Sequence, residues 1–173
     1  TDKVIEALNI GSVEMVNLHQ NLLTPDFILI GMLEQEASMT VKLIETSYPE
    51  NKNLSNQILE KLFLLQENQA KFEGSTIQQI QSSAETETCF QIALQESKKL
   101  GDKFVGLDAM FLALFDKRVG HVADVLSEFG LEYAKVKEDI EIMRGGRNID
   151  EKDAEGKLDV INEYTSDLTD LAR

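Results

Sequence analysis

The feature of this sequence that most limits its fold is an internal repeat. When the chain is shifted by 82 residues against itself, the apolar pattern superposes without a gap from about Ala7 to Ile58. Most matched positions share only apolar character. Identical residues coincide at Ile10/Ile92, Glu14/Glu96, Leu18/Leu100, Asp26/Asp108 and Ile58/Ile140. An ungapped register over roughly 50 residues indicates one structural unit that occurs twice.

The first copy is predicted to form four helices, because its apolar residues recur at helical spacing. A central, almost wholly apolar helix is expected to start at Thr24-Pro25, with a hydroxyl N-cap followed by proline at the first helical position. The other helices are expected at about residues 2–19, 38–46 and from 53 onward.

The second copy repeats this plan. A capping box at Ser75–Gln78 predicts the start of a long helix that ends at Leu100. Further helices are expected at about 107–117, 119–129 and 132–143, and glycines follow three of the four helix ends. We therefore predict an all-α domain over residues 1–146, with repeat one at about 1–71 and repeat two at about 75–146.

The charge of the chain restricts its partners. Acidic residues number 31 and basic residues 17, which gives a net charge of −14. Nucleic-acid binding requires a basic surface, so we expect no nucleic-acid partner, and an anionic membrane surface is equally unfavourable. No apolar run approaches the roughly 20 residues of a membrane span. The acidic surface either serves solubility or attracts basic partners.

The single cysteine and the chain start indicate the compartment. Cys89 lies on an apolar stripe, where a buried and inert thiol is expected. The sequence from Thr1 to Val4 does not have the pattern of a signal peptide. We expect a cytoplasmic protein.

The composition of the sequence changes after Arg147. Residues 148–157 are charged and nearly free of apolar side chains, which predicts a mobile linker. Apolar residues then return at helical spacing at Leu158, Ile161, Tyr164, Leu168 and Leu171. Such a short helix needs a neighbouring surface, so residues 147–173 are predicted to lead from the repeats into a following domain.

Three stretches carry a resemblance to a known family. They are LGDKFVGLD at residues 100–108, MRGG at 143–146 and YTSDLTDLAR at 164–173. Together with the double repeat, they resemble the N-terminal domain of the Clp/Hsp100 ATP-driven unfoldases, most closely the ClpB branch, with ClpC and ClpA next. Two departures from the family pattern are Gly11-Ser12 inside the first helix and Asp108 in place of the commoner glutamate.

The resemblance implies a double Clp-N fold with pseudo-twofold symmetry, joined by a linker to two AAA+ ATPase modules that assemble as a hexamer. The chain contains no Gly-x-x-x-x-Gly-Lys-Ser/Thr loop, so we expect no enzyme activity and no cofactor in it. ATP and magnesium would belong to the AAA+ modules, which are absent from this chain. The isolated domain is expected to be a monomer.

The resemblance also implies a function, namely capture of unfolded or aggregated polypeptides or of an adaptor protein. In the ClpB branch the important positions match Thr1, Asp102 and Asp108 of this chain. Each also has a purely structural explanation. Thr1 and Asp108 suit a helix start, and Asp102 suits the turn after Gly101.

Two other functions stay open at this point. Asp26 and Asp108 occupy equivalent places in the first turns of the two central helices. In ClpC-like domains acids at these places receive phosphorylated arginine, and a carboxylate suits the planar guanidinium fork, although aspartate is shorter than the family's glutamate. A third reading is a passive helical module that only packs against a neighbouring domain.

Catalytic and metal sites are not predicted. His19 and His121 are the only histidines, and with one cysteine they provide no zinc-ligand spacing. Residues 151–162 faintly resemble a calcium loop but lack the aspartate expected at its first place and the glutamate expected at its twelfth.

Overall fold

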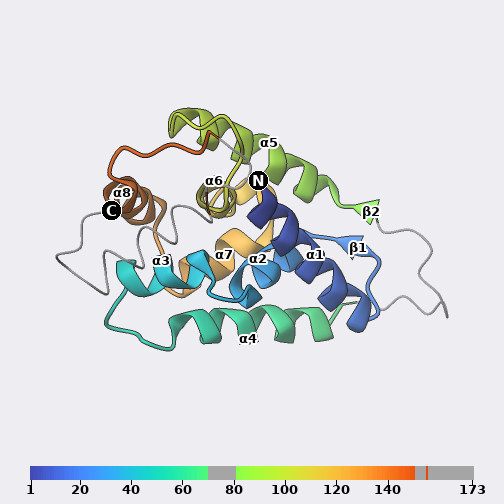
Figure 1. The fold of residues 1–173 in the computed structure, drawn as a ribbon. Helices are drawn as coiled ribbons and strands as arrows, with labels where there is room; N and C mark the ends of the chain where they lie inside the picture. The colour runs from blue at the N-terminus through green and yellow to red at the C-terminus, as the bar shows by residue number, and fades with distance from the viewer. Residues whose placement is uncertain (70–80, 151–154, 156–173) are drawn as a thin grey trace.

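The structure is a computed structural model of the 173-residue chain, and it describes residues 1–69, 81–150 and 155. The tail motif after residue 155, its predicted helix and the capping box at Ser75–Gln78 lie outside the described residues. Figure 1 shows the described part as an assembly of helices with one short pair of strands. The helices are α1 (Asp2–Asn17), α2 (Pro25–Glu34), α3 (Met39–Ser47), α4 (Leu54–Glu67), α5 (Ala84–Lys99), α6 (Leu107–Ala113), α7 (His121–Glu128) and α8 (Tyr133–Arg144), with a 3₁₀ turn η1 (Lys117–Val119).

The helix starts confirm the repeat and the all-α prediction. The first residues of α1 and α5, of α2 and α6, and of α3 and α7 are each 82 positions apart. Helix α8 begins at Tyr133, three residues earlier than the position that matches the start of α4. Each copy therefore forms the predicted four-helix unit.

The two copies exchange equivalent hydrogen bonds at their beginnings. Ser83 donates its backbone N–H to the carbonyl of Leu23 at 2.9 Å, and the nitrogen of Thr1 donates to the carbonyl of Val105 at 2.9 Å. Because Thr1 matches Ser83 and Leu23 matches Val105 in the register, these contacts are pseudo-twofold mates. Strands β1 (Leu22–Leu23) and β2 (Gln81–Ser82) pair in parallel beside the first of them, as Figure 1 shows.

Helix caps agree with the sequence in part. The hydroxyl of Thr1 accepts from the N–H of Val4, as predicted, and Ser83 plays the same role for α5. Helix α5 begins at Ala84, because Gln81–Ser82 are extended and paired with β1; the predicted start at Ser75 is therefore wrong. Pro25 opens α2 as expected, but the Thr24 hydroxyl makes no cap bond.

Helices α2 and α6 form the centre of one continuous apolar core, which confirms their prediction as buried helices. Every residue of α2 from Pro25 to Leu33 is buried, and Asp108 alone in α6 is not fully buried. For α6 the predicted end at Lys117 is too late, because the helix stops at Ala113 and the turn η1 follows.

Helix α1 crosses α2 closely at two glycines. A methyl group on Gly11 would lie 2.2 Å from the carbonyl oxygen of Phe27, and one on Gly31 would lie 1.9 Å from that of Ala7. Both distances are far below van der Waals contact. The equivalent residues in the second copy are Ala93 and Ala113, both fully buried. Gly11, which departs from the family pattern, thus allows the backbones to approach.

The chain after α8 packs on repeat two. Ile149 is buried beside Phe104, and its carbonyl accepts from the N–H of Lys103 at 2.8 Å. Glu155 is also buried. At these two positions the predicted mobile linker is wrong, because the chain makes specific contacts with the second copy. None of the helices in the described ranges is long and apolar enough to span a membrane.

Replacing Gly31 by alanine tests the α1–α2 crossing. Alanine normally favours a helix interior by about 1 kcal/mol over glycine, but the added methyl group must push α1 away from α2. We expect a net loss of about 3 kcal/mol or more in the free energy of unfolding, measured by urea denaturation. The control is Asn9→Ala on the exposed face of α1, which should cause no loss. An equally stable Gly31→Ala variant would contradict the crossing.

Candidate functional site at the seam between the copies

Thr1 lies where α1 of the first copy meets the beginning of α6 of the second. Its hydroxyl donates to the carboxylate of Glu155, and the same carboxylate accepts from the backbone N–H of Leu107 at 2.5 Å. Gly106 permits this approach, since a methyl group there would lie 2.3 Å from Ile149 and 3.1 Å from Glu155. Thr1 and the start of α6 are thereby brought together around one buried acid.

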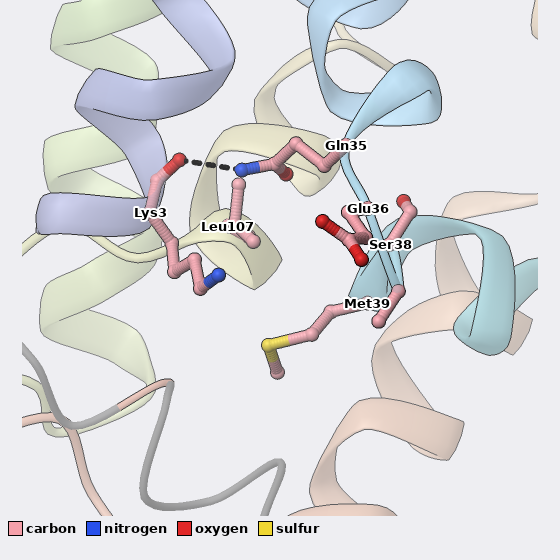
Figure 2. A pocket seen from close by; sticks show the side chains of 7 residues that line it. Lys3, Gln35, Glu36, Ser38, Met39 and Leu107 are labelled. Atoms are coloured by element: carbon pink, nitrogen blue, oxygen red, sulfur yellow. Dashed lines mark hydrogen bonds between the residues drawn. The ribbon is translucent and has the colours of Figure 1, made fainter.

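A small pocket of about 40 Å³ lies beside this contact. Figure 2 shows it between the start of α1, the connection from α2 to α3, and the start of α6. It is lined by Lys3, Gln35, Glu36, Ala37, Ser38, Met39 and Leu107. The amide of Gln35 donates to the carbonyl of Lys3 at 2.9 Å and so fixes the pocket wall. The lining combines apolar side chains with one cation and one anion.

Asp102 and Asp108 share one guanidinium. Arg144 Nη1 lies 2.6 Å from Oδ1 of Asp102, and Arg144 Nε lies 3.0 Å from Oδ2 of Asp108. Oδ1 of Asp102 also accepts from the N–H of Ile149 at 2.8 Å. The turn after α5, the first turn of α6 and the end of α8 are therefore joined by one buried ionic cluster.

Burial and charge act in opposite directions on these acids. Burial raises the pKa of the Asp108 carboxyl above its ordinary value, and the neighbouring Asp102 raises it further, whereas Arg144 lowers it. Burial likewise raises the pKa of Glu155, against the hydrogen bonds from Thr1 and Leu107. Without Arg144, two aspartates and Glu155 would face one another at the start of α6.

The two copies also meet at a second seam, which lies at the start of α2. Asp26 belongs to this second seam and has other partners. It is buried in the first turn of α2, where its carboxylate accepts from the side-chain amide of Gln66 on α4. His121 at the start of α7 places Nε2 2.5 Å from Oδ2 of Asp26, which links the two copies. The hydrogen bond to Asp26 raises the pKa of His121.

The two acids that match in the repeat are therefore not equivalent in chemistry. In the register Arg144 falls on Leu62, and His121 falls on Met39, a residue of the pocket. Asp108 faces an internal guanidinium, while Asp26 faces an amide and a half-exposed imidazole. The structure brings Thr1, Asp102 and Asp108 to one region but places Asp26 among different partners.

Sequence reasoning missed Arg144, Gln66 and Glu155. For Arg144 a signal was present, because the repeat register placed a charged residue opposite the apolar Leu62 at a core position. A charge at such a position needs a buried partner of opposite sign. Asp102 and Asp108, already candidate site residues, were suitable partners. No comparable signal marked Glu155, which follows an acidic stretch.

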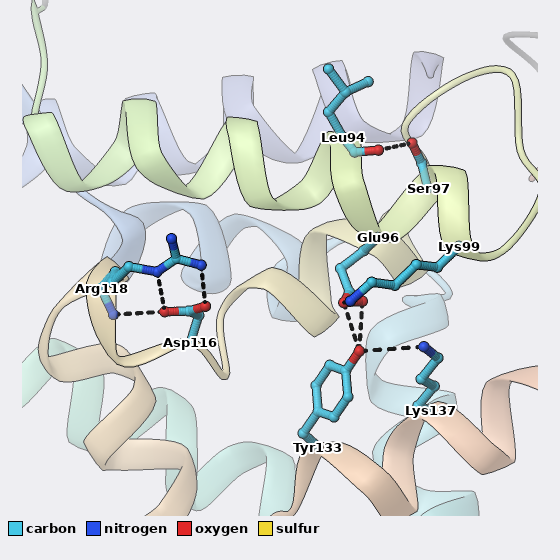
Figure 3. Close-up of polar contacts among 8 residues, drawn as sticks. All are labelled: Leu94, Glu96, Ser97, Lys99, Asp116, Arg118, Tyr133 and Lys137. Atoms are coloured by element: carbon cyan, nitrogen blue, oxygen red, sulfur yellow. Dashed lines mark hydrogen bonds and ion pairs between the residues drawn. The ribbon is translucent and has the colours of Figure 1, made fainter.

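Helix α8, which carries Arg144, is fixed by a second polar contact. Figure 3 shows the hydroxyl of Tyr133, at the start of α8, donating to the buried carboxylate of Glu96 on α5. The two Tyr133–Glu96 oxygen distances are 2.6 and 2.8 Å. The same figure shows Arg118 paired with Asp116 at η1, an exposed contact within one turn. The first contact orients α8 relative to α5, whereas the second is local.

Among the described residues, no group of three or more His, Cys, Asp or Glu side chains is arranged to hold a metal ion. Cys89 is fully buried, and burial raises the pKa of its thiol to about 12. Such a thiol stays protonated at neutral pH and is a poor nucleophile.

Fold and seam together define a class, the helical double-repeat domains built from two four-helix units. The family model for the Clp repeat (R) N-terminal domain matches residues 1–129. The chain belongs to this Clp N-terminal domain family.

The relatives and solved structures agree with that assignment. The chain is 24% identical over 173 residues to the chaperone protein ClpB of Corynebacterium glutamicum and 26% identical over 155 residues to the chloroplastic chaperone protein ClpB3 of Arabidopsis thaliana. The two matches include 100% and 89% of this chain, but they span only 20% and 15% of the length of these two relatives. The Hsp104 N-terminal domain from Candida albicans has the same fold, with a TM-score of 0.67 and 18% identity over 87% of this chain and 94% of that one.

The Asp26–His121 contact predicts a pH-dependent stability. The folded-state pKa of His121 is raised, so the stabilisation is fully present below the ordinary value of about 6.5 and is lost as pH rises through the folded-state pKa. The melting temperature of the wild type should exceed that of His121→Gln by a margin that shrinks as the pH rises above neutrality. His19→Gln is the matched control, and the difference between its melting temperature and that of the wild type should not depend on pH in this way. A margin independent of pH would refute the contact.

Proposed function

We propose that this chain is the non-catalytic capture domain of a ClpB-type protein disaggregase, and that it binds unfolded or aggregated polypeptides at the seam formed by α1 and α6. The observation that supports the proposal most directly is the convergence of Thr1, Asp102 and Asp108 at this seam, beside a pocket with apolar lining. Thr1 comes from the first copy and lies about 100 residues before Asp102 and Asp108, which come from the second copy. Asp26 is proposed as a secondary contact at the second seam.

The chemistry of the pocket suits a polypeptide of undefined sequence. Met39 and Leu107 offer apolar contact, while Lys3 and Glu36 offer one charge of each sign to backbone groups. A small site of this kind buries little area, so the expected affinity is in the micromolar range. Weak binding permits release of the polypeptide to the next step.

The rest of the parent protein is proposed from the resemblance to the Clp/Hsp100 unfoldases, since this chain spans only 20% and 15% of the two relatives. This domain would be joined to two AAA+ modules, which would bind ATP and magnesium and assemble as a hexamer in the cytoplasm. The isolated domain would remain a monomer. An adaptor protein would bind at the same seam, since an adaptor presents the same peptide groups.

Recruitment of phosphoarginine, as in ClpC-like domains, is less well supported by the contacts. The carboxylate of Asp108 already holds the guanidinium of Arg144 at 3.0 Å, and that of Asp26 is buried against Gln66 and His121. A guanidinium ligand would have to displace these partners.

Titration with an unfolded model polypeptide tests the proposal. A fluorescently labelled, reduced and carboxymethylated model protein should bind the chain with a Kd of roughly 1–100 µM, measured by anisotropy. Asp108→Asn and Thr1→Val should each weaken binding by about tenfold, since each removes a group worth about 1.4 kcal/mol. Circular dichroism should show unchanged helix content.

Glu60→Gln, which removes a charge from the exposed face of α4, is the control and should bind as the wild type does. Absence of binding by the wild type would favour the passive module. Preferential binding of a phosphoarginine peptide, lost in Asp26→Asn, would favour the ClpC-like function.

A further inference from the structure

Repeat two contains a buried ionic cluster that the described residues of repeat one lack. The side chain of Asp102 is fully buried, that of Arg144 is 7% exposed and that of Asp108 is 17% exposed. One guanidinium is thus shared by two carboxylates within the protein.

Repeat one serves as an internal control for what the fold requires. In the register Leu62 stands at the place of Arg144, and Gln20 stands at the place of Asp102. Leu62 is fully buried in the apolar core, and its four-helix unit has the same arrangement. Buried ion pairs are frequently no more stabilising than apolar residues of similar size. The four-helix unit therefore folds without such a cluster. The presence of the cluster in repeat two is not explained by packing alone.

The cluster has the location and geometry of a support for the capture site. Asp108 follows Leu107, a residue of the pocket, and its carboxylate remains partly accessible while Arg144 fixes one of its oxygens. The planar guanidinium fork holds two carboxylates in one relative orientation, which an ammonium group cannot do. Oδ2 of Asp102 and Nη2 of Arg144 are buried without a hydrogen-bond partner among the described residues, so the cluster is not fully satisfied internally.

We propose that Arg144, which is anchored by the buried Asp102, is a positioning residue of the capture site and orients Asp108 at the start of α6 for contact with a bound polypeptide. This inference rests on the proposed function and deepens it. Arg144 acts through Asp108 and makes no contact of its own with the ligand.

The first test separates this role from a structural one. In the 173-residue chain, the variant Asp102→Asn/Asp108→Asn/Arg144→Leu removes all three charges and gives repeat two the leucine of repeat one. It should melt at or above the wild-type temperature. An unfolded triple variant would show that the fold itself needs the cluster and would overturn the inference.

The second test keeps every charge and changes only the geometry. Arg144→Lys should fold and should weaken binding of the carboxymethylated polypeptide by about tenfold, a change of about 1.4 kcal/mol. The double variant Asp108→Asn/Arg144→Lys should bind no more weakly than Asp108→Asn alone, because both changes disrupt one unit. Arg118→Lys, at the exposed pair with Asp116, is the matched control and should bind as the wild type does.

If Arg144→Lys does not fold, the wild type still decides the question. The Nε–H resonance of Arg144 should shift when the model polypeptide saturates the chain, because Nε donates to Asp108. An unshifted resonance, or wild-type affinity in a folded Arg144→Lys variant, would overturn the role of Arg144. Failure of the wild type to bind at all would instead overturn the proposed function.

Discussion

The reciprocal hydrogen bonds between the first residue of each copy and the other copy determine where everything else lies. Ser83 bonds to Leu23, and Thr1 bonds to Val105. Each bond places the beginning of one copy's first helix beside the beginning of the other copy's central helix. Two seams result, one at the start of α6 and one at the start of α2. Helix starts concentrate unpaired N–H groups, and in the first seam Glu155 accepts from that of Leu107. In the second seam the carboxylate of Asp26 contacts the side chains of Gln66 and His121 instead.

The same scaffold supports different chemistry in its two seams. Apolar core positions are conserved in character between the copies, since close packing leaves little freedom there. The polar positions around the two acids diverge. Asp108 is held by a guanidinium, whereas Asp26 is held by an amide and an imidazole. A fold made from two equal units can therefore carry two unequal surfaces without any change in its architecture.

The apolar register was sufficient to predict the fold, because helical spacing reports which side chains face a core. Together with the helix-end signals, namely Pro25 and the glycines, it correctly placed the start of α2 and the ends of α5, α7 and α8. It failed where a contact distant in sequence decides. Residues 81–82 are extended because they pair with β1, and Ile149 is buried because it meets Phe104. The positions of the site acids followed from resemblance. The register marked Arg144 only as a charge at a core position, and its pairing with Asp102 and Asp108 is shown by the packing of α8 against α6.

The hydrogen bonds and ion pairs already formed within the first seam also limit how strongly a polypeptide could bind there. Thr1 already donates to Glu155, and Asp102 and Asp108 already accept from Arg144. Under the proposed function, groups that already have a partner offer a polypeptide fewer new hydrogen bonds than free groups would, so the net free energy of binding is smaller. A seam of free, unpaired charges would bind more tightly but would also destabilise the empty domain. The arrangement therefore favours a stable empty domain and, under the proposed function, weak and reversible binding.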